Sequence, residues 1–200
     1  KSSEDPLPCI VVRSLDQLSE MRSMIDEKDD IKLAQYLRGV EGGGAESRED
    51  LISFINLIDS VPMINLIDGD ITWIAHYYNI GSSGEKTNGT LYVSTVSDNG
   101  DWTRIEYKLF ETDINTEIEK MRTDERNLDE ENTDSFTSDD GKIKVYYQTK
   151  KKHPSGTGDM YEWIASIDEK IAHVVYFTTD SKDIIASDFF GEIKIGPVWN

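Results

Sequence analysis

Tyrosines recur along this chain at a fixed offset of 69 residues. Random placement would give well under about one match at a given offset, so the recurrence predicts an internal repeat. The hairpin glycines Gly69 and Gly141 lie 72 residues apart, and the alignment therefore needs a three-residue gap there. Eight of the nine tyrosines pair in this way: Tyr77 with Tyr146, Tyr78 with Tyr147, Tyr92 with Tyr161, and Tyr107 with Tyr176.

The first copy of the repeat has the pattern of an antiparallel meander. Residues 63–67 and 71–80 are rich in β-branched and aromatic residues, and Asp68-Gly69 between them predicts a hairpin closed by a tight turn. Residues 90–97 and 102–110 form a second such pair, joined through Asn99-Gly100. The sequence therefore predicts four strands here and a second set within residues 140–179.

Amphipathic helices are predicted around these strands. Each begins at a residue that can cap a helix and continues with apolar residues three or four positions apart. The last helix would carry Ile184, Ile185 and Phe189 on its apolar face. The expected helix starts are Ser14, a position near Asp30, Ser47, Thr112 or Asp113, and Ser181.

These elements predict an α+β fold of two tandem helix-plus-meander units, about four strands each, with the N-terminal helices packed on the sheet. Residues 1–8 are expected to be a polar tether, residues 9–122 the N-terminal strand, helices and first meander, and residues 142–200 the second meander with a C-terminal helix. The acidic residues 123–141 would connect them. With 37% hydrophobic residues, the chain can bury one compact core.

Charge restricts the class of partner. The chain has 21 basic and 39 acidic residues, a net charge of −18, and such a field repels nucleic acids and anionic lipid surfaces. No run of 18 apolar residues predicts a membrane span. Because the chain begins at Lys1 rather than Met, we expect a signal peptide or lipid anchor upstream and an extracytoplasmic location. A cytoplasmic location is the alternative.

Catalytic, cofactor and metal motifs are absent from the sequence. The glycines at 42–44 are followed by no Gly-Lys-Ser/Thr, which a phosphate loop needs. The acidic residues between 124 and 140 lack the spacing of a calcium-binding EF-hand. We therefore assign no catalytic residue, no metal and no cofactor. A strand histidine, His76 or His173, beside a carboxylate would be required for the alternative that the protein is a hydrolase.

Strand alternation supplies the candidate site. In the predicted strand 71–80, Ile74, His76 and Tyr78 share one face, as do Ile143, Val145 and Tyr147 in the second copy. The opposite face mixes aromatic and charged residues, a composition typical of recognition surfaces. The alternative is that the N-terminal helices bury this face. The candidate binding residues are Trp73, Tyr77, Trp102, Tyr146, His173 and Phe177.

The predicted arrangement, a helix plus four strands occurring twice, resembles in architecture the tandem-repeat secreted inhibitor proteins that bind β-lactamases. No sequence motif shared with that family allows a functional residue to be assigned in this chain. The expected function is binding of a protein or other macromolecule, such as one at a cell surface, by a non-enzymatic, secreted or lipid-anchored bacterial protein. The binding would use the sheet face or the hairpin loops. The alternatives are an acidic cytoplasmic inhibitor and the hydrolase.

Overall fold

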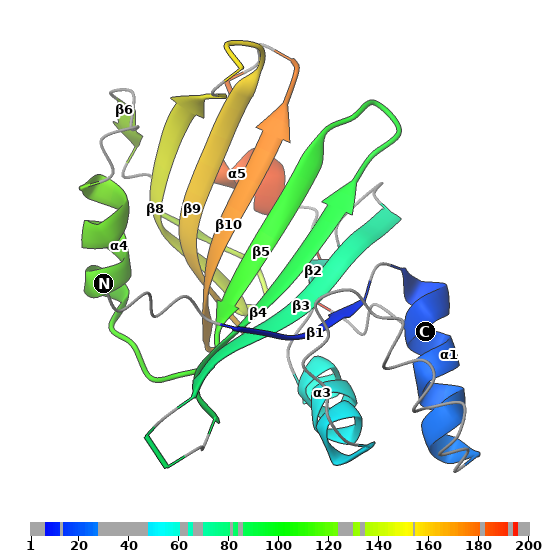
Figure 1. The fold of residues 1–200 in the computed structure, drawn as a ribbon. Helices are drawn as coiled ribbons and strands as arrows, with labels where there is room; N and C mark the ends of the chain where they lie inside the picture. The colour runs from blue at the N-terminus through cyan, green and yellow to red at the C-terminus, as the bar shows by residue number, and fades with distance from the viewer. Residues whose placement is uncertain are drawn as a thin grey trace.

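The computed structural model describes residues 7–12, 14–27, 48–60, 64–65, 70–80, 82–83, 86–123, 130–132, 135–153, 155–180, 183–191 and 194–195. In this part of the chain the fold is α+β, as the sequence predicts. Helices, one open antiparallel sheet and a separate two-stranded sheet make up the structure (Figure 1). The described helices are α1 (Leu15–Asp26), α3 (Arg48–Ser60), α4 (Ile114–Arg122) and α5 (Ala186–Phe190). Each of these helices is too short to span a lipid bilayer.

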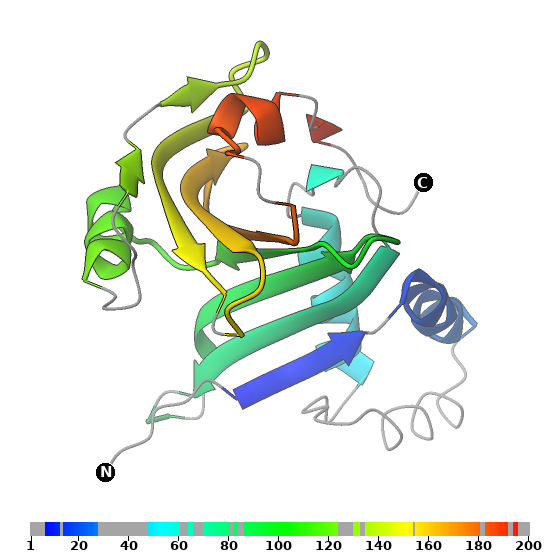
Figure 2. The ribbon, with the colours of Figure 1, turned by 90° about the horizontal axis from the view of Figure 1, so that it is seen from above.

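Seven main strands form the sheet, with β3-β4-β5 on one side of the β5–β10 junction, β10-β9-β8 on the other, and β1 added beyond β3. Figure 2 shows that the sheet is strongly curved and that α4 and α5 lie on opposite sides of it. Two short strands, β6 (Glu130–Asn132) and β7 (Phe136–Thr137), pair with β8. The order is β1 (Leu7–Val12), β3 (Asp70–Ile80), β4 (Lys86–Val96), β5 (Trp102–Lys108), β10 (Lys170–Thr178), β9 (Asp159–Ile167), β8 (Ile143–Lys152).

Two of the predicted turns are confirmed. Gly100 has a φ of 88° in the turn that joins β4 to β5, where the Ser97 amide donates to the Asp101 carbonyl over 2.8 Å. Gly141 has a φ of 70° in the hairpin between β7 and β8. Positive φ values are accessible to glycine at little steric cost, so these glycines determine where the chain reverses. The predicted turn at Asp68-Gly69 lies outside the described residues.

The first predicted hairpin is wrong. The two residues described within 63–67 form β2 (Ile64–Asn65), which pairs with β11 (Lys194–Ile195) near the end of the chain. β3 lies instead between β1 and β4. The physical reason is the length of the ladder: the six residues of β1 can make more backbone hydrogen bonds to β3 than a two-residue strand can.

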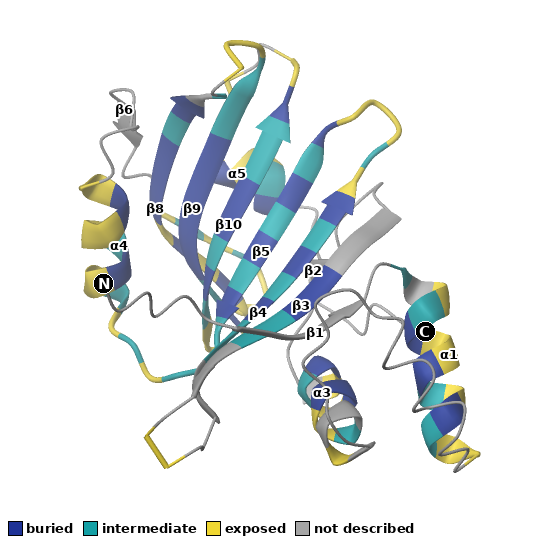
Figure 3. Ribbon diagram, viewed as in Figure 1, coloured by how far each residue is buried: buried dark blue, intermediate teal, exposed yellow. Residues whose placement is uncertain are grey.

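The main core lies on the face of the sheet that bears α5, here called the inner face. There Ile105, Val174 and Trp163 from the strands pack with Phe190 of α5. The N-terminal helices contribute to the same cluster, through Leu18, Met21 and Met24 of α1 and Phe54, Ile55 and Ile58 of α3. These helices therefore pack on the sheet as predicted, but they cover the inner face. The pattern of burial along the strands is visible in Figure 3.

A second, smaller cluster lies on the opposite face of the sheet, here called the outer face. Met121 of α4 packs there with Tyr147 and Ile164. The prediction that Tyr147 shares a face with Ile143 and Val145 is wrong, because these two residues belong to the main core. A shift in register between Val145 and Tyr147 explains the difference. An extra residue in one strand reverses the facing of the residues that follow.

The helix starts are confirmed where they are described, except for the last helix. The Ser14 hydroxyl accepts from the Gln17 amide over 3.1 Å, and the Asp113 carboxylate accepts from the Thr116 amide over the same distance. The last helix begins at Ala186 rather than near Ser181, and Ile185 is 40% exposed rather than part of an apolar face. The predicted start at Ser47, the helix near Asp30 and the glycines at 42–44 lie outside the described residues.

Candidate functional site

The outer face carries the candidate site because β5 alternates strictly between the two sides of the sheet. Thr103, Ile105 and Tyr107 are buried, whereas the residues between them are half-exposed. The register continues this division across the neighbouring strands. The outer-face residues discussed below are Tyr77, Tyr92, Trp102, Arg104, Glu106, Lys108, Lys151, Glu162, His173 and Phe177.

Three rings gather at one end of the outer face. Trp102 and Phe177 are directly opposite each other on β5 and β10, and their rings are stacked with centroids 5.7 Å apart. The His153 ring, from the loop between β8 and β9, meets Phe177 edge-on at 4.8 Å. Gly158 makes room for Phe177, since a Cβ there would lie 2.7 Å from the ring. We call Trp102, Phe177 and His153 the aromatic shelf.

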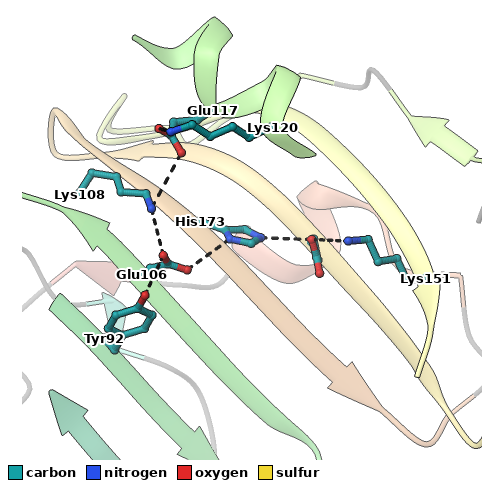
Figure 4. Close-up of polar contacts among 8 residues, drawn as sticks. Tyr92, Glu106, Lys108, Glu117, Lys120, Lys151 and His173 are labelled. Atoms are coloured by element: carbon teal, nitrogen blue, oxygen red, sulfur yellow. Dashed lines mark hydrogen bonds and ion pairs between the residues drawn. The ribbon is translucent and has the colours of Figure 1, made fainter. Parts of the chain in front are cut away.

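A row of polar contacts crosses the centre of the outer face (Figure 4). The Tyr92 hydroxyl on β4 donates to Glu106 Oε1 on β5 over 3.0 Å. His173 on β10 lies between two carboxylates: its Nδ1 is 3.5 Å from Glu106 Oε2, and its Nε2 is 3.3 Å from Glu162 Oε2 on β9. Lys151 on β8 closes the row, with its Nζ 3.1 Å from the same Glu162 oxygen. The row therefore links five adjacent strands through side chains.

Two further contacts extend the site at either side. Lys108 Nζ lies 3.0 Å from Glu106 Oε1 and 3.9 Å from Glu117 of α4, so the row is connected to that helix. At the other end, the Tyr77 ring on β3 meets Tyr92 edge-to-face at 5.1 Å. The outer face thus presents aromatic groups around a centre of paired charges.

The charges in the row determine the protonation of its members. Burial alone would raise the pKa of Glu106, but the hydrogen bond with His173 and the charge of Lys108 outweigh it and lower the pKa to about 2. The pKa of Glu162 is also lowered, because His173 and Lys151 outweigh the effect of burial. Burial alone would lower the pKa of His173, yet the two carboxylates raise it above its ordinary value. The two carboxylates therefore favour the imidazolium form of His173, which lies between them.

Stability is expected to fall as the pH rises through the pKa of His173. A raised folded-state pKa means that the stabilisation is complete below the ordinary value of 6.5 and is lost as the pH rises through the folded value. The lowered pKa of Glu106 has the opposite sign: its contribution is complete above 4.5 and is lost as the pH falls towards 2. Urea unfolding midpoints measured as a function of pH test both the loss of stability at alkaline pH (the alkaline limb of the profile) and the loss at acidic pH.

The matched variants for that experiment are His173→Asn and His153→Asn. The first should flatten the alkaline limb, since it removes the titrating group, and the second should leave that limb unchanged. An alkaline limb that survives in His173→Asn would contradict the assignment.

The structure brings together four of the six residues predicted for the site. Trp102, Phe177 and His173 lie on the outer face, and Tyr77 joins them through Tyr92. Tyr146 is 43% exposed on β8, three strands away from Trp102. The side chain of Trp73 lies outside the described residues.

Glu162 and Lys151 were not predicted, although they complete the row. A signal for Glu162 exists in the sequence: this carboxylate stands directly between Tyr161 and Trp163. Strand alternation places it opposite those two rings, on the outer face. Nothing in the sequence indicates that His173 would be its partner, since β9 and β10 had to be placed in register first.

The geometry limits what His173 can do chemically. A general base needs an unprotonated ring nitrogen within reach of a substrate. Here each ring nitrogen faces a carboxylate, and the raised pKa favours the protonated ring. Among the described residues, His, Cys, Asp and Glu side chains form no group of three placed to hold a metal ion. The arrangement is suited to fixing charges in place.

Comparison of the chain with protein-family models, with curated proteins and with solved structures finds no match.

Proposed function

We propose that this chain is a non-enzymatic binding protein that docks a positively charged protein on the outer face of its sheet. The observation that carries the proposal is the aromatic shelf: Trp102 and Phe177 are stacked and half-exposed on a sheet face. Large aromatic side chains held rigidly in this way are the usual anchors at the centres of protein interfaces. Arg104, Glu106 and His173 next to the shelf supply charges that could orient a partner.

Coverage of the sheet supports the choice of this face. The described helices α1, α3 and α5 pack into the inner-face core. On the outer face, α4 contributes Met121 against Tyr147 and Ile164, towards the β8 edge. Among the described elements, no helix packs on the shelf, and α4 reaches β5 at Lys108, the last residue of that strand.

Charge supports the choice of partner. The net charge of −18 attracts a basic protein and repels nucleic acids and other polyanions. Charge complementarity of this kind speeds association and selects among partners. The proposal keeps both settings that the sequence predicts, since a protein of strongly negative net charge can attract a basic partner equally when secreted or lipid-anchored and when it is a cytoplasmic inhibitor. It does not keep a hydrolase that uses His173, because each nitrogen of that ring faces a carboxylate.

The experiment compares the capture of basic proteins by the wild-type full chain, by a variant of the aromatic shelf and by a control variant. Immobilised wild-type protein should retain a basic protein from an extract of the source organism at low salt and release it as salt rises. The double variant Trp102→Ala/Phe177→Ala should lose most of this binding, because truncating an interface anchor costs about 2 kcal/mol or more. Ile185→Ala, which changes an exposed apolar residue at the start of α5, is the control.

Ile185→Ala should bind like the wild type. The proposal is wrong if the double variant, shown to be folded by circular dichroism, retains the same protein with the same affinity. Release that does not depend on salt would contradict the charge of the proposed partner.

We also propose that the sheet arose by duplication of a unit that contains three of its strands and a following helix. The strand order supports this, since β3-β4-β5 and β8-β9-β10 meet symmetrically at β5 and β10. At that junction Ile105 is directly opposite Val174, and the two residues differ by the same offset of 69. The pair Tyr92 and Tyr161 does not fit, because Tyr92 lies on the outer face and Tyr161 in the inner core.

An experimental structure tests the duplication by superposition of β3–β4–β5 on β8–β9–β10. Matching strand directions and matching positions of the helices that follow would support it, whereas different positions of α4 and α5 relative to their strands would contradict it.

A further inference from the structure

The guanidinium group of Arg104 is a charged donor that the described part of the chain does not use. Its Nε is buried and has no hydrogen-bond partner there. Nor does an ion pair or other hydrogen bond join this side chain to a described residue. Buried donors in native proteins almost always have partners, because an unsatisfied one is costly, and more so when it is charged. A group that is left over in this way calls for an acceptor from elsewhere.

The carboxylates of the neighbouring polar row are already engaged by other cations. Glu106 is paired with Lys108 and faces His173, and it also accepts from Tyr92. Glu162 is shared by Lys151 and His173. Lys108, Lys151 and His173 already outnumber these two carboxylates, so Arg104 stands as an additional cation on the outer face of a strongly acidic protein.

The neighbours of Arg104 are suited to an apolar ligand. Arg104 is two residues from Trp102 along β5, so both side chains project from the same side of the strand. It is directly opposite Ser94 on β4 and Val175 on β10. Phe177, two residues from Val175, is stacked on Trp102. The cation thus lies between the aromatic shelf on one side and Glu106, two residues further along β5, on the other, and no hydrogen bond or ion pair joins it to that carboxylate.

We propose that Arg104 recognises a carboxylate carried by an apolar group, with the apolar group lying against the aromatic shelf. The planar fork of an arginine matches the two oxygens of a carboxylate, and Nε with one terminal nitrogen can donate to both. The net charge of −18 disfavours ligands with several negative charges, so a single carboxylate fits this surface better than a phosphate. Binding requires the half-exposed side chain to turn its Nε edge outwards.

This inference rests on the proposed function, because the protein partner would supply the carboxylate. The carboxylate would be an acidic side chain or the C-terminus of that partner. A basic protein can present one carboxylate beside an apolar residue, and the pair would satisfy both the arginine and the shelf. The contact would fix the orientation of the partner, whereas the overall charges bring the two proteins together.

The experiment uses 3-phenylpropionate as the probe and its neutral amide, 3-phenylpropanamide, as the matched control ligand. Nitrogen-15 NMR of the full chain follows the Arg104 Nε–H signal during titration. The propionate should shift this signal and quench the fluorescence of Trp102, and the amide should bind at least about tenfold more weakly, the factor for losing one charge-assisted hydrogen bond. Arg104→Gln should weaken propionate binding by a similar factor.

Two further variants distinguish the effect of the two parallel N–H donors of Arg104 from the effect of positive charge alone. Arg104→Lys keeps the positive charge but not the two parallel donors, so its affinity should fall between those of the wild type and Arg104→Gln. Lys170→Gln, which removes an exposed cation at the start of β10, should leave binding unchanged. The inference is overturned if the Arg104 Nε–H signal does not move with the propionate, or if Arg104→Gln binds it as tightly as the wild type.

Capture of the basic partner distinguishes the failure of this inference from the failure of the proposed function. If Arg104→Gln keeps full affinity for the partner while Trp102→Ala/Phe177→Ala loses it, the proposed function stands and the carboxylate contact is wrong. If the propionate shifts Arg104 but the double variant keeps the partner, the carboxylate site stands and the outer face is not the docking surface.

Discussion

Replacing Trp163 by alanine is expected to lower the free energy of unfolding by about 3–5 kcal/mol, the range for truncating a large aromatic side chain in a core. Trp163 is fully buried on β9. Its ring is stacked on Phe189 at 4.7 Å and meets Phe190 edge-on at 5.3 Å. Trp163 therefore holds α5 against the sheet, and its loss leaves a cavity between them.

Trp163 also makes a buried hydrogen bond. Its Nε1 donates to Gln148 Oε1 over 2.7 Å, and the Gln148 amide in turn donates to the Ile184 carbonyl over 3.0 Å. The alanine variant leaves the Gln148 oxygen without this donor, which adds to the cost of the cavity. Because domains of this size are stable by only about 5–15 kcal/mol, the variant would lose a large share of the total.

Urea unfolding curves of three variants, each compared with the wild type, measure this effect. Trp163→Phe keeps most of the buried ring and loses the hydrogen bond, so its cost should be nearer to about 1 kcal/mol. Trp102→Ala changes a half-exposed residue on the outer face and should also cost about 1 kcal/mol. Equal midpoints for Trp163→Ala and Trp102→Ala would contradict the assignment of the core to the inner face.

Replacing Glu162 by glutamine is expected to cost about 3–5 kcal/mol, the range for breaking a buried ion pair by removing one partner. The side chains of Lys151 and Glu162 are 5% and 9% exposed. The glutamine would leave the buried Lys151 ammonium and the His173 imidazolium without the carboxylate that they share. The pKa of His173 should then fall, because one of the two carboxylates that raise it is gone.

The second experiment combines this variant with Lys151→Met. The double variant removes both charges of the pair and should recover part of the stability lost in Glu162→Gln, since the cost comes mainly from the charge left behind. The exposed Glu111→Gln is the control and should stay within about 0.5 kcal/mol of the wild type. A double variant that is no more stable than Glu162→Gln would show that the pair is not buried as described.

The sequence predicted the features that depend on neighbouring residues. The capping residues Ser14 and Asp113 predicted where two helices begin, and Gly100 and Gly141 predicted two reversals of the chain. Alternation along β5 separated the inner from the outer residues and so placed Trp102 at the candidate site. Such signals act within a few residues, and the folded chain obeys them locally.

The sequence did not predict the strand bulges or the pairing of distant strands, because both depend on the neighbouring strands and helices in the folded chain. The register shift after Val145 places Tyr147 on the outer face. The residues of β8 themselves give no sign of this shift. β2 pairs with β11, some 130 residues further on, although a local hairpin with β3 was expected. Neighbouring strands and helices decide these choices through packing and the length of the backbone ladder.

The sequence by itself determined the α+β class, the negative net charge and the presence of a mixed aromatic and charged strand face. Only the tertiary structure decided which of those charges meet. His173 lies between Glu106 and Glu162 because β10 is flanked by β5 and β9, strands from different parts of the chain. The same order left Arg104 without an acceptor among the described residues. Electrostatic contacts depend on distances of a few ångströms, and those distances exist only once the strands are in register.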